Sequence, residues 1–332
     1  MEYKNILKKL SLIILIPLGI LITHISSHHP TFVEKIYSTK INKIFIQILS
    51  SITGIVSFSI GEFIVLSIII LFIITLIKTI TKLINSKSNW QYTLLSFILN
   101  ILMFISIVYF MFITMWGLNY HRLSFGEISG LNTSKASIDE LELLCEVLIN
   151  RTNRLREKVT ENENGIMTFS YQKSMLYKRS KIGYNKVSDI FPELSGNYGI
   201  PKGVFLSEAL CYMGITGIYF PFTGEANVNT KTPAPMLPAT ICHEMAHQRG
   251  FAREDEANYI AYLTCNMHPD IEFKYSGNLL ALIHSMNALY KYDRDRYIEL
   301  AKKYTDKVYR DLKYIKEFWK QYEGPLKKHL LN

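Results

Sequence analysis

The sequence has few cysteines, and some common enzyme signatures are missing from it. Only four cysteines occur in 332 residues, at Cys145, Cys211, Cys242 and Cys265. A chain this long with so few cysteines is not built on a disulfide framework. We therefore expect buried free thiols, and leave open one bridge in an extracellular domain. The sequence also contains no phosphate-binding loop and no Gly-x-Ser-x-Gly elbow, so it gives no support for those two kinds of chemistry.

Acidic residues are scarce in the first part of the chain. Residues 1–120 contain 9 Lys and Arg against 3 Asp and Glu, whereas the rest contains 28 and 25, for a net charge of +9. Basic residues beside long apolar runs are typical of membrane-flanking charge, whereas nucleic-acid binding needs a basic patch on a folded face. We therefore expect the lipid bilayer as a partner, and no nucleic acid.

Long apolar runs are confined to residues 1–120, where they predict an α-helical membrane domain. The expected transmembrane helices cover about 10–25, 62–81 and 94–118. The first run is not followed by a small-x-small cleavage site, so an uncleaved anchor is favoured over a signal peptide. Segment 31–60 is amphipathic, and we expect it to lie along the membrane interface or partly re-enter it.

Three spans place the two ends of the membrane domain on opposite sides of the bilayer. Lysines at the N-terminus and within 78–87 favour a cytoplasmic position for both of those segments. Residues 121–332 of this multi-pass cell-membrane protein are then extracytoplasmic. Lys35, Lys40 and Lys43, in the loop after the first span, oppose this orientation weakly.

Residues 121–332 predict a soluble, mainly α, α+β domain with a small sheet. Ser137 and Glu140 form a capping box ahead of an amphipathic helix, and a second helical segment covers about 171–191. Recurrent glycines beside aromatic and β-branched residues follow. They predict short strands at about 203–207, 216–220 and 225–229.

The most specific chemical pattern in the chain is His243-Glu244-Met-Ala-His247. Two histidines four residues apart share one helical face and can bind the same ion. Glu244 can then take a proton from a water on that ion. Pro238 suits the first turn of a helix and Gly250 suits the position just past its end, so the motif is expected on one helix of about three turns.

A third ligand is expected from the second helical run, which opens at Glu254. Two imidazoles and one carboxylate, with a fourth position left to water, form a catalytic Zn²⁺ set. Glu256 is a rival ligand because the gap after His247 is short. In a regular helix Glu256 points roughly 200° away from Glu254, which shares its face with Ala257, so the geometry favours Glu254. Asn258, one turn further on, can orient a ligand side chain.

The last expected strand contains Glu225, Ala226 and Asn227, and it ends roughly nine residues before the metal helix. In zinc peptidases an extended edge strand beside the metal helix commonly pairs with the substrate backbone. These three residues are therefore candidates for a substrate-binding edge strand. An ordinary hairpin is the alternative.

The two motifs resemble those of gluzincin-type metallopeptidases, in which His-Glu-x-x-His is followed by Glu-x-x-Ala-Asp or Glu-x-x-Ala-Asn. In this resemblance Glu254 is the third zinc ligand, and Ala257 and Asn258 take the next two places. The seven-residue gap before Glu254 departs from the gluzincin pattern. It is closer to the compact arrangement of metzincins, in which the third ligand would fall on Arg253.

The whole chain is also similar to a bacterial membrane family catalogued as domain of unknown function 3810. The similarity rests on the three spans and on three segments: Ser59-Ile-Gly-Glu62, Trp116-Gly-Leu-Asn-Tyr120 and Pro221-Phe-Thr-Gly-Glu225-Ala-Asn227. It implies a peptidase-like protein with a zincin-like domain, and it names no substrate.

The leading hypothesis is a membrane-anchored zinc metalloendopeptidase that acts on a peptide or protein substrate. In it His243, His247 and Glu254 hold Zn²⁺, and Glu244 is the general base. The second hypothesis is a zinc-binding membrane sensor or interaction module without turnover, which needs zinc to fold but has no use for a base at Glu244. The third is a chance pattern on a surface helix, which predicts no bound zinc.

Overall fold

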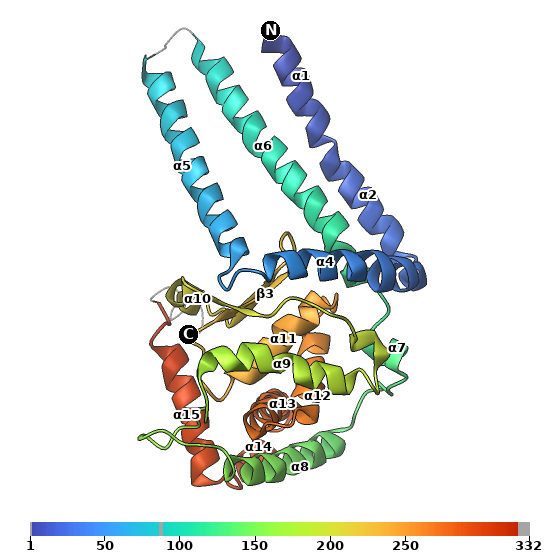
Figure 1. Ribbon diagram of the computed structural model, residues 1–332, viewed down its shortest axis with the longest axis vertical. Coiled ribbons are helices and arrows are strands. Elements are labelled where there is room, and N and C mark those ends of the chain that lie inside the picture. The colour runs from blue at the N-terminus through green and yellow to red at the C-terminus, as the bar shows by residue number, and fades with distance from the viewer. Residues whose placement is uncertain (1, 86–88, 325–332) are drawn as a thin grey trace.

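The structure is a computed structural model that describes residues 2–85 and 89–324, with long helices rising from a compact helical domain (Figure 1). The rising helices are α1 (Glu2–Ile13), α2 (Leu15–Ser27), α5 (Ile60–Asn85) and α6 (Trp90–Met115). Within the described residues, three stretches are long and apolar enough to cross a membrane: Lys8–Ser27, Ile60–Asn85 and Trp90–Met115. The three predicted spans are therefore confirmed.

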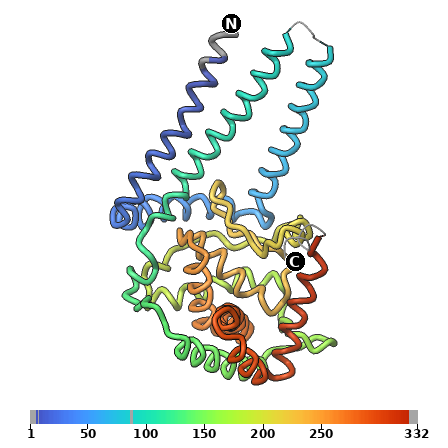
Figure 2. The backbone as a smooth tube through the Cα atoms, turned by 180° about the vertical axis from the view of Figure 1, so that it is seen from behind, coloured from blue at the N-terminus to red at the C-terminus, as the bar shows by residue number. Residues whose placement is uncertain are grey.

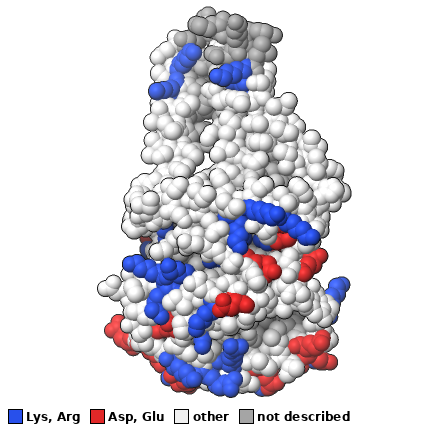
Figure 3. All heavy atoms as spheres, turned by 45° about the vertical axis from the view of Figure 1, so that its right-hand side comes forward, with Lys and Arg blue, Asp and Glu red and all other residues white. Residues whose placement is uncertain are grey.

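The membrane helices expose their apolar side chains because lipid, rather than a protein core, is their natural surrounding. Only 6% of the most apolar window of α5 is buried inside the protein. On the face drawn in Figure 3, a band without charged side chains separates lysines at the far end of the spans from mixed charges on the other domain. Helix α6 packs against α1, α2 and α5, so it is the central helix of the group.

A layer of helices lies between the spans and the C-terminal domain, and it is formed by the segment expected at the interface. Figure 1 shows α4 crossing beneath the spans. On α4, Ile44 and Ile48 are exposed whereas Ile46 and Ser50 are buried, which is the amphipathic pattern of an interfacial helix. The layer consists of α3 (Pro30–Phe32), the π-helix η1 (Val33–Asn42) and α4 (Lys43–Thr53).

The C-terminal domain is mainly helical and contains one small sheet, as predicted. Its elements are η3 (Gly117–His121), α7 (Phe125–Ser129), α8 (Ile138–Arg156), α9 (Lys173–Val187), η4 (Pro192–Leu194), β1 (Lys202–Val204), α10 (Ser207–Tyr212), β2 (Gly217–Phe220), β3 (Glu225–Asn229), α11 (Leu237–Gln248), α12 (Glu254–Met267), α13 (Ile271–Tyr292), α14 (Arg294–Ala301) and α15 (Asp306–Lys320). The capping box of Ser137 and Glu140 begins α8, with both reciprocal hydrogen bonds present. All four cysteines are buried and free, so the expected buried thiols are confirmed.

The sheet has three strands in the order β1-β3-β2, with β1 parallel and β2 antiparallel to β3. All five residues of β3 are buried. The prediction that Glu225, Ala226 and Asn227 form an edge strand is wrong, because β3 pairs with a neighbour on each side. The metal helix α11 packs against both β3 and β2, and of these two strands β2 is the one at the edge of the sheet.

Glu225 instead fastens the sheet to a membrane span. Its carboxylate accepts hydrogen bonds from the backbone N–H groups of Ile60 and Gly61 at 3.0 and 2.7 Å, at the start of α5. The Lys202 ammonium on β1 donates to the same carboxylate at 2.5 Å. A carboxylate at a helix N-terminus satisfies unpaired N–H groups and interacts favourably with the helix dipole. The foot of α5 is thereby held on the sheet.

Helix α13 is the centre of the C-terminal domain and is seen nearly end-on in Figure 1, surrounded by other helices. It packs against α8, α11, α12 and α14. Helix α11 is also almost wholly buried, between the sheet and α12. A helix buried on every side is held rigidly, so the side chains of α11 have fixed positions.

Candidate metal centre

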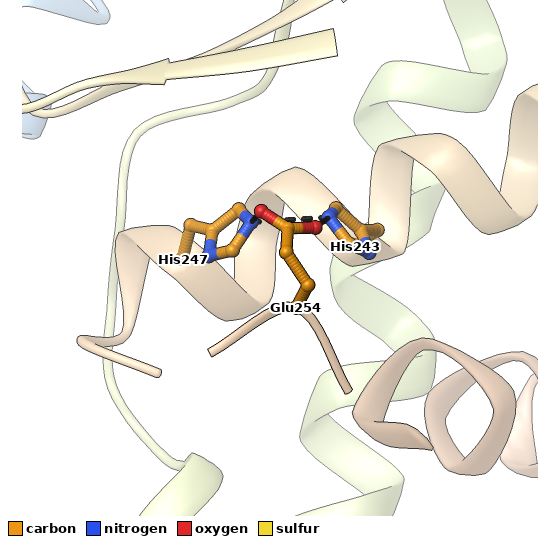
Figure 4. Close-up of side chains that lie close together, drawn as sticks. All are labelled: His243, His247 and Glu254. Atoms are coloured by element: carbon orange, nitrogen blue, oxygen red, sulfur yellow. Dashed lines mark hydrogen bonds and ion pairs between the residues drawn. The ribbon is translucent and has the colours of Figure 1, made fainter. Parts of the chain in front are cut away.

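The metal motif occupies α11 and the first residue of α12. His243 and His247 are one turn apart and project from the same face of α11, and Glu254 reaches toward both rings (Figure 4). Gly250 connects the two helices with φ +82°, a left-handed conformation that favours glycine at a helix C-terminus. A Cβ at this position would also stand 3.1 Å from Asn119 Oδ1. This turn folds α12 back, so that Glu254 faces the histidines.

The three side chains approach one another as ligands of a common ion would. His243 Nε2 lies 3.0 Å from His247 Nε2. Glu254 Oε2 lies 3.2 Å from His243 Nε2, and Glu254 Oε1 lies 3.5 Å from His247 Nε2. Ligand atoms bound about 2.0–2.1 Å from a tetrahedral ion are about 3.3 Å apart. The three distances therefore fit an ion of the size of Zn²⁺.

Hydrogen bonds on the far side of each ring decide which nitrogen faces the centre with a lone pair. His247 Nδ1 lies 2.8 Å from the Phe251 carbonyl oxygen, and His243 Nδ1 lies 2.9 Å from Asn258 Oδ1. Both oxygens only accept hydrogen bonds, so each Nδ1 carries a proton and each Nε2 keeps its lone pair in the neutral ring. Two lone pairs and a carboxylate this close repel one another unless protons or a cation lie between them. Histidines that bind a metal are typically oriented by such a hydrogen bond from the other ring nitrogen.

The contact between Glu254 and His247 shifts the pKa values of both groups. Hydrogen bonds with His243 and His247 hold the pKa of Glu254 well below its usual value. Burial lowers the pKa of His247, but the Glu254 carboxylate and the charge of Glu244 outweigh burial and raise it. The Glu254 side chain is 77% exposed, whereas those of His243 and His247 are 14% and 8% exposed. The centre is thus open on the Glu254 side.

Glu244 lies beside the ligands, buried beneath β2. Its Oε2 has no hydrogen-bond partner among the described residues. Burial raises the pKa of Glu244 above its ordinary value. Gly217 on β2 stands directly against the carboxylate, because a Cβ there would overlap Glu244 Oε1. An unpaired carboxylate oxygen beside three potential metal ligands suits a group that takes and returns a proton.

A pocket of about 420 Å³ opens next to the three ligands. One wall is formed by residues 214–219, which include the first part of β2. Trp116, the residue that follows α6, also lines the pocket, together with Glu244. The Trp116 ring makes an edge contact with the His247 ring, at 6.1 Å between centroids. The sequence patterns did not identify Trp116 or Gly217, because both come near Glu244 only through pairings with distant segments.

The rival ligand Glu256 is engaged elsewhere. Its carboxylate accepts a hydrogen bond from the Phe125 N–H at 2.8 Å, at the first residue of α7. The residue is buried, with 7% of its surface exposed. It therefore stabilises the start of α7, and among the described residues the three that can share a metal ion are His243, His247 and Glu254. Asn258 is where the helical spacing predicts it, in contact with a ligand ring.

Fold and site together define an α-helical membrane protein that carries a candidate His-His-Glu metal centre on its second domain. The chain belongs to the protein family of unknown function DUF3810, whose model matches residues 37–332. No curated protein and no solved structure matches the chain. The family match begins within η1, so it includes the rest of the interfacial layer, two of the spans and the candidate metal centre.

Proposed function

We propose that this protein is a membrane-anchored, zinc-dependent metalloendopeptidase with a zincin-like domain. The supporting observation is that His243, His247 and Glu254 bring their ligand atoms within 3.5 Å of one another, beside an unpaired oxygen of Glu244. Two imidazoles and one carboxylate, with one side open to a pocket, suit catalytic zinc. When bound, zinc lowers the pKa of a water ligand toward about 7 and polarises a carbonyl group.

Glu244 is the residue that moves the proton in this proposal. Its free Oε2 takes a proton from the attacking water and returns it to the leaving amine. Asn258 and the Phe251 carbonyl hold the two rings in the tautomer that binds a metal. Burial, and then the charge of Glu254, raise the pKa of Tyr120, so its phenol keeps a proton. The Tyr120 ring packs edge-on against that of Trp116, which lines the pocket, at 5.4 Å between centroids, so Tyr120 is our candidate donor to the substrate's carbonyl oxygen.

Strand β2 is the part of the sheet that can align a substrate. It has one edge paired with β3, and its other edge pairs with no strand in the part of the chain that the structure describes. Residues Gly217, Ile218 and Tyr219 line the pocket beside the metal ligands. An extended peptide that pairs with this edge would bring its backbone carbonyl groups past Glu244.

The side of the membrane on which the site works follows from the lysines. The start of α1, the end of α5 and the start of α6 lie at the same far end of the molecule (Figure 2). Lys78 and Lys82 approach that connection, and Lys8 and Lys9 lie near the N-terminus. Basic residues favour the cytoplasm, so we propose that the C-terminal domain is extracytoplasmic.

The test uses the full chain in lipid nanodiscs, loaded with one equivalent of zinc. Unstructured peptides of mixed sequence are offered at high concentration, both free and fused to a transmembrane helix, and the products are identified by mass spectrometry. We expect hydrolysis that stops on chelation. Glu244→Gln is the matched variant, because it keeps the size and the buried position of the side chain. It should keep its zinc and lose about 10²–10⁴-fold in rate.

Two results would count against the proposal. Full hydrolysis by Glu244→Gln would remove the assigned base. Stoichiometric zinc with no hydrolysis of either kind of peptide, and loss of folding on chelation, would instead support a zinc-binding sensor or interaction module.

A further inference from the structure

The candidate metal centre lies close to the end of a candidate membrane span. Helix α6 spans from Trp90 to Met115, and Trp116 follows directly. The Trp116 side chain lines the pocket, and its indole Nε1 donates a hydrogen bond to the His247 carbonyl oxygen at 3.2 Å. A candidate metal ligand is therefore in contact with the first residue after the span. A soluble protein would have to approach the bilayer closely to reach this pocket.

The wall of the pocket that β2 forms is attached to the foot of another span. The Phe220 ring at the end of β2 packs so closely on Gly61 of α5 that a Cβ at Gly61 would overlap it. Beside it, the Glu62 carboxylate accepts the backbone N–H groups of Phe205 and Leu206 at 3.0 and 2.7 Å. Phe205 is 73% exposed although it is aromatic. An exposed apolar segment bound to the first turn of a span faces lipid.

Above the pocket, the same two spans form an apolar groove. Its volume is about 400 Å³. Figures 1 and 2 both show α5 and α6 close together near their connection and diverging toward the C-terminal domain. Helices α1 and α2 pack on α6, and no described element fills the groove. The lining residues are Ile68, Ile69, Leu71, Phe72, Thr75, Phe97, Asn100, Ile101 and Phe104.

The groove contains one amide that calls for a polar partner. Thr75 donates its hydroxyl to the Leu71 carbonyl within α5. The Asn100 side chain makes no hydrogen bond with any residue in 2–85 or 89–324. Within a membrane such an amide is stabilised by a hydrogen bond across a helix–helix interface, which a lipid tail cannot supply. The occupant that fits is a transmembrane helix.

We propose that the substrate is a membrane-spanning polypeptide. Its transmembrane helix occupies the groove between α5 and α6, and its chain is cut just outside the bilayer. This inference rests on the proposed peptidase function. From Leu71 to Gly61, α5 descends about 15 Å, so a helix beside it leaves the membrane next to Phe220. From Phe220 to Gly217, which touches Glu244, β2 covers about 10 Å, or about three extended residues.

Three probes of equal concentration in nanodiscs test the inference with zinc-loaded protein. The first carries a mixed-sequence segment of about twelve residues directly after a Leu/Ala transmembrane helix with one Gln near its middle, whose amide can pair with that of Asn100. The second has a flexible Gly/Ser spacer of about twenty residues between helix and segment, which keeps the tether but moves the segment away from the bilayer. The third is the free segment. We expect the first probe to be cut about tenfold faster than the second, within its first few residues outside the helix.

Variants of the groove separate helix binding from mere nearness to the membrane. Ile101→Trp fills the groove and Asn100→Leu removes its amide. Ile70→Trp is the matched control, because Ile70 lies on α5 outside the groove and is 56% exposed. The two groove variants should cut the first probe about fivefold more slowly, and they should cut the free segment at the wild-type rate. The control variant should cut both probes at the wild-type rate.

The outcomes are distinguishable. Cleavage of all three probes at one Glu244-dependent rate overturns the substrate class and leaves the peptidase function standing. If the first probe is preferred and neither groove variant reduces that preference, the groove does not bind the substrate helix. In that case lipid occupies the groove. No cleavage of any probe by the zinc-loaded protein overturns the proposed function itself, and this inference with it.

Discussion

The indole of Trp116 donates a hydrogen bond to the backbone carbonyl of His247, 131 residues further along the chain. One partner ends a membrane span and the other is a candidate metal ligand, and both residues are buried. The membrane part is therefore more than an anchor. It forms part of the wall of the pocket and holds the end of α11 in place.

Trp116→Phe should loosen the metal helix without removing the aromatic contact. The His247 carbonyl would lose the indole but keep the Gly250 N–H at 2.9 Å, so we expect a loss of about 0.5–1.5 kcal/mol in the free energy of unfolding. Thermal unfolding of the zinc-free protein in nanodiscs measures it. Trp90→Phe is the control, because Trp90 is 50% exposed at the other end of α6. An equal effect of both substitutions would contradict the role of this hydrogen bond.

Zinc analysis of single variants tests the ligand set. His243→Ala and Glu254→Ala should each reduce bound zinc well below one equivalent, since each removes a ligand from a three-residue set. Glu256→Ala should keep its zinc. It should instead lose about 1–3 kcal/mol of stability, because the buried Phe125 N–H loses its acceptor. Inductively coupled plasma mass spectrometry and a thermal melt give the two readouts, and loss of zinc from Glu256→Ala would reverse the assignment.

Asn258 should act through the His243 ring rather than by touching the metal. Asn258→Leu removes the oxygen that accepts the Nδ1 proton, so zinc should bind about 10–100-fold more weakly. Asn258→Asp keeps an acceptor and should retain most of the affinity. Competition with a fluorescent chelator measures both constants. If the two variants bind zinc equally well, the hydrogen bond does not orient the ligand.

Arg122 joins the interfacial layer to the turn between the two metal helices. Its guanidinium donates to both Glu34 oxygens at 2.7 and 2.8 Å, and to the Gly250 carbonyl at 3.1 Å. It also stacks 4.1 Å over the Phe251 ring. Arg122→Ala leaves the buried Glu34 carboxylate unpaired, so we expect a loss of about 3–5 kcal/mol in unfolding free energy.

A double-mutant cycle with Glu34→Ala isolates this ion pair from the other contacts of Arg122. The comparison is Lys313→Ala, whose partner Glu317 forms a solvent-exposed pair on α15. That variant should change stability by less than about 1 kcal/mol. Additive effects of Arg122→Ala and Glu34→Ala in the cycle would show that the pair does not link the layer to the turn.

Local patterns in the sequence predict the spans, the Ser137 cap and the three strands, because hydrophobic period and capping chemistry are properties of neighbouring residues. The choice of Glu254 over Glu256 also follows from helical geometry, since the two side chains point apart. Strand order cannot be read in this way. Glu225 lies in a central strand because β3 pairs with β1 and β2, and it caps α5 through contacts with residues more than 160 positions earlier. Trp116 likewise reaches the site through a contact with His247, 131 residues later.

Gly217 should be required for Glu244 to occupy its position. A Cβ on Gly217 would overlap Glu244 Oε1, and the three atoms nearest to it all belong to Glu244. Gly217→Ala should therefore keep its zinc, and its rate of hydrolysis should fall by up to about 10²–10⁴-fold, which is the contribution expected of the base. Bound zinc and the rate are measured on one preparation. Gly324→Ala is the control, because nothing described lies within 4 Å of a Cβ there.

The double variant Gly217→Ala/Glu244→Gln shows whether the glycine acts through that carboxylate. If it does, the double variant is no slower than Glu244→Gln alone, because the group that the methyl displaces has already lost its function. A further loss of rate in the double variant would mean that the methyl group blocks the substrate at β2. Wild-type hydrolysis by Gly217→Ala would mean that the methyl group is accommodated without moving Glu244. Either result would contradict the role of Gly217 in positioning Glu244.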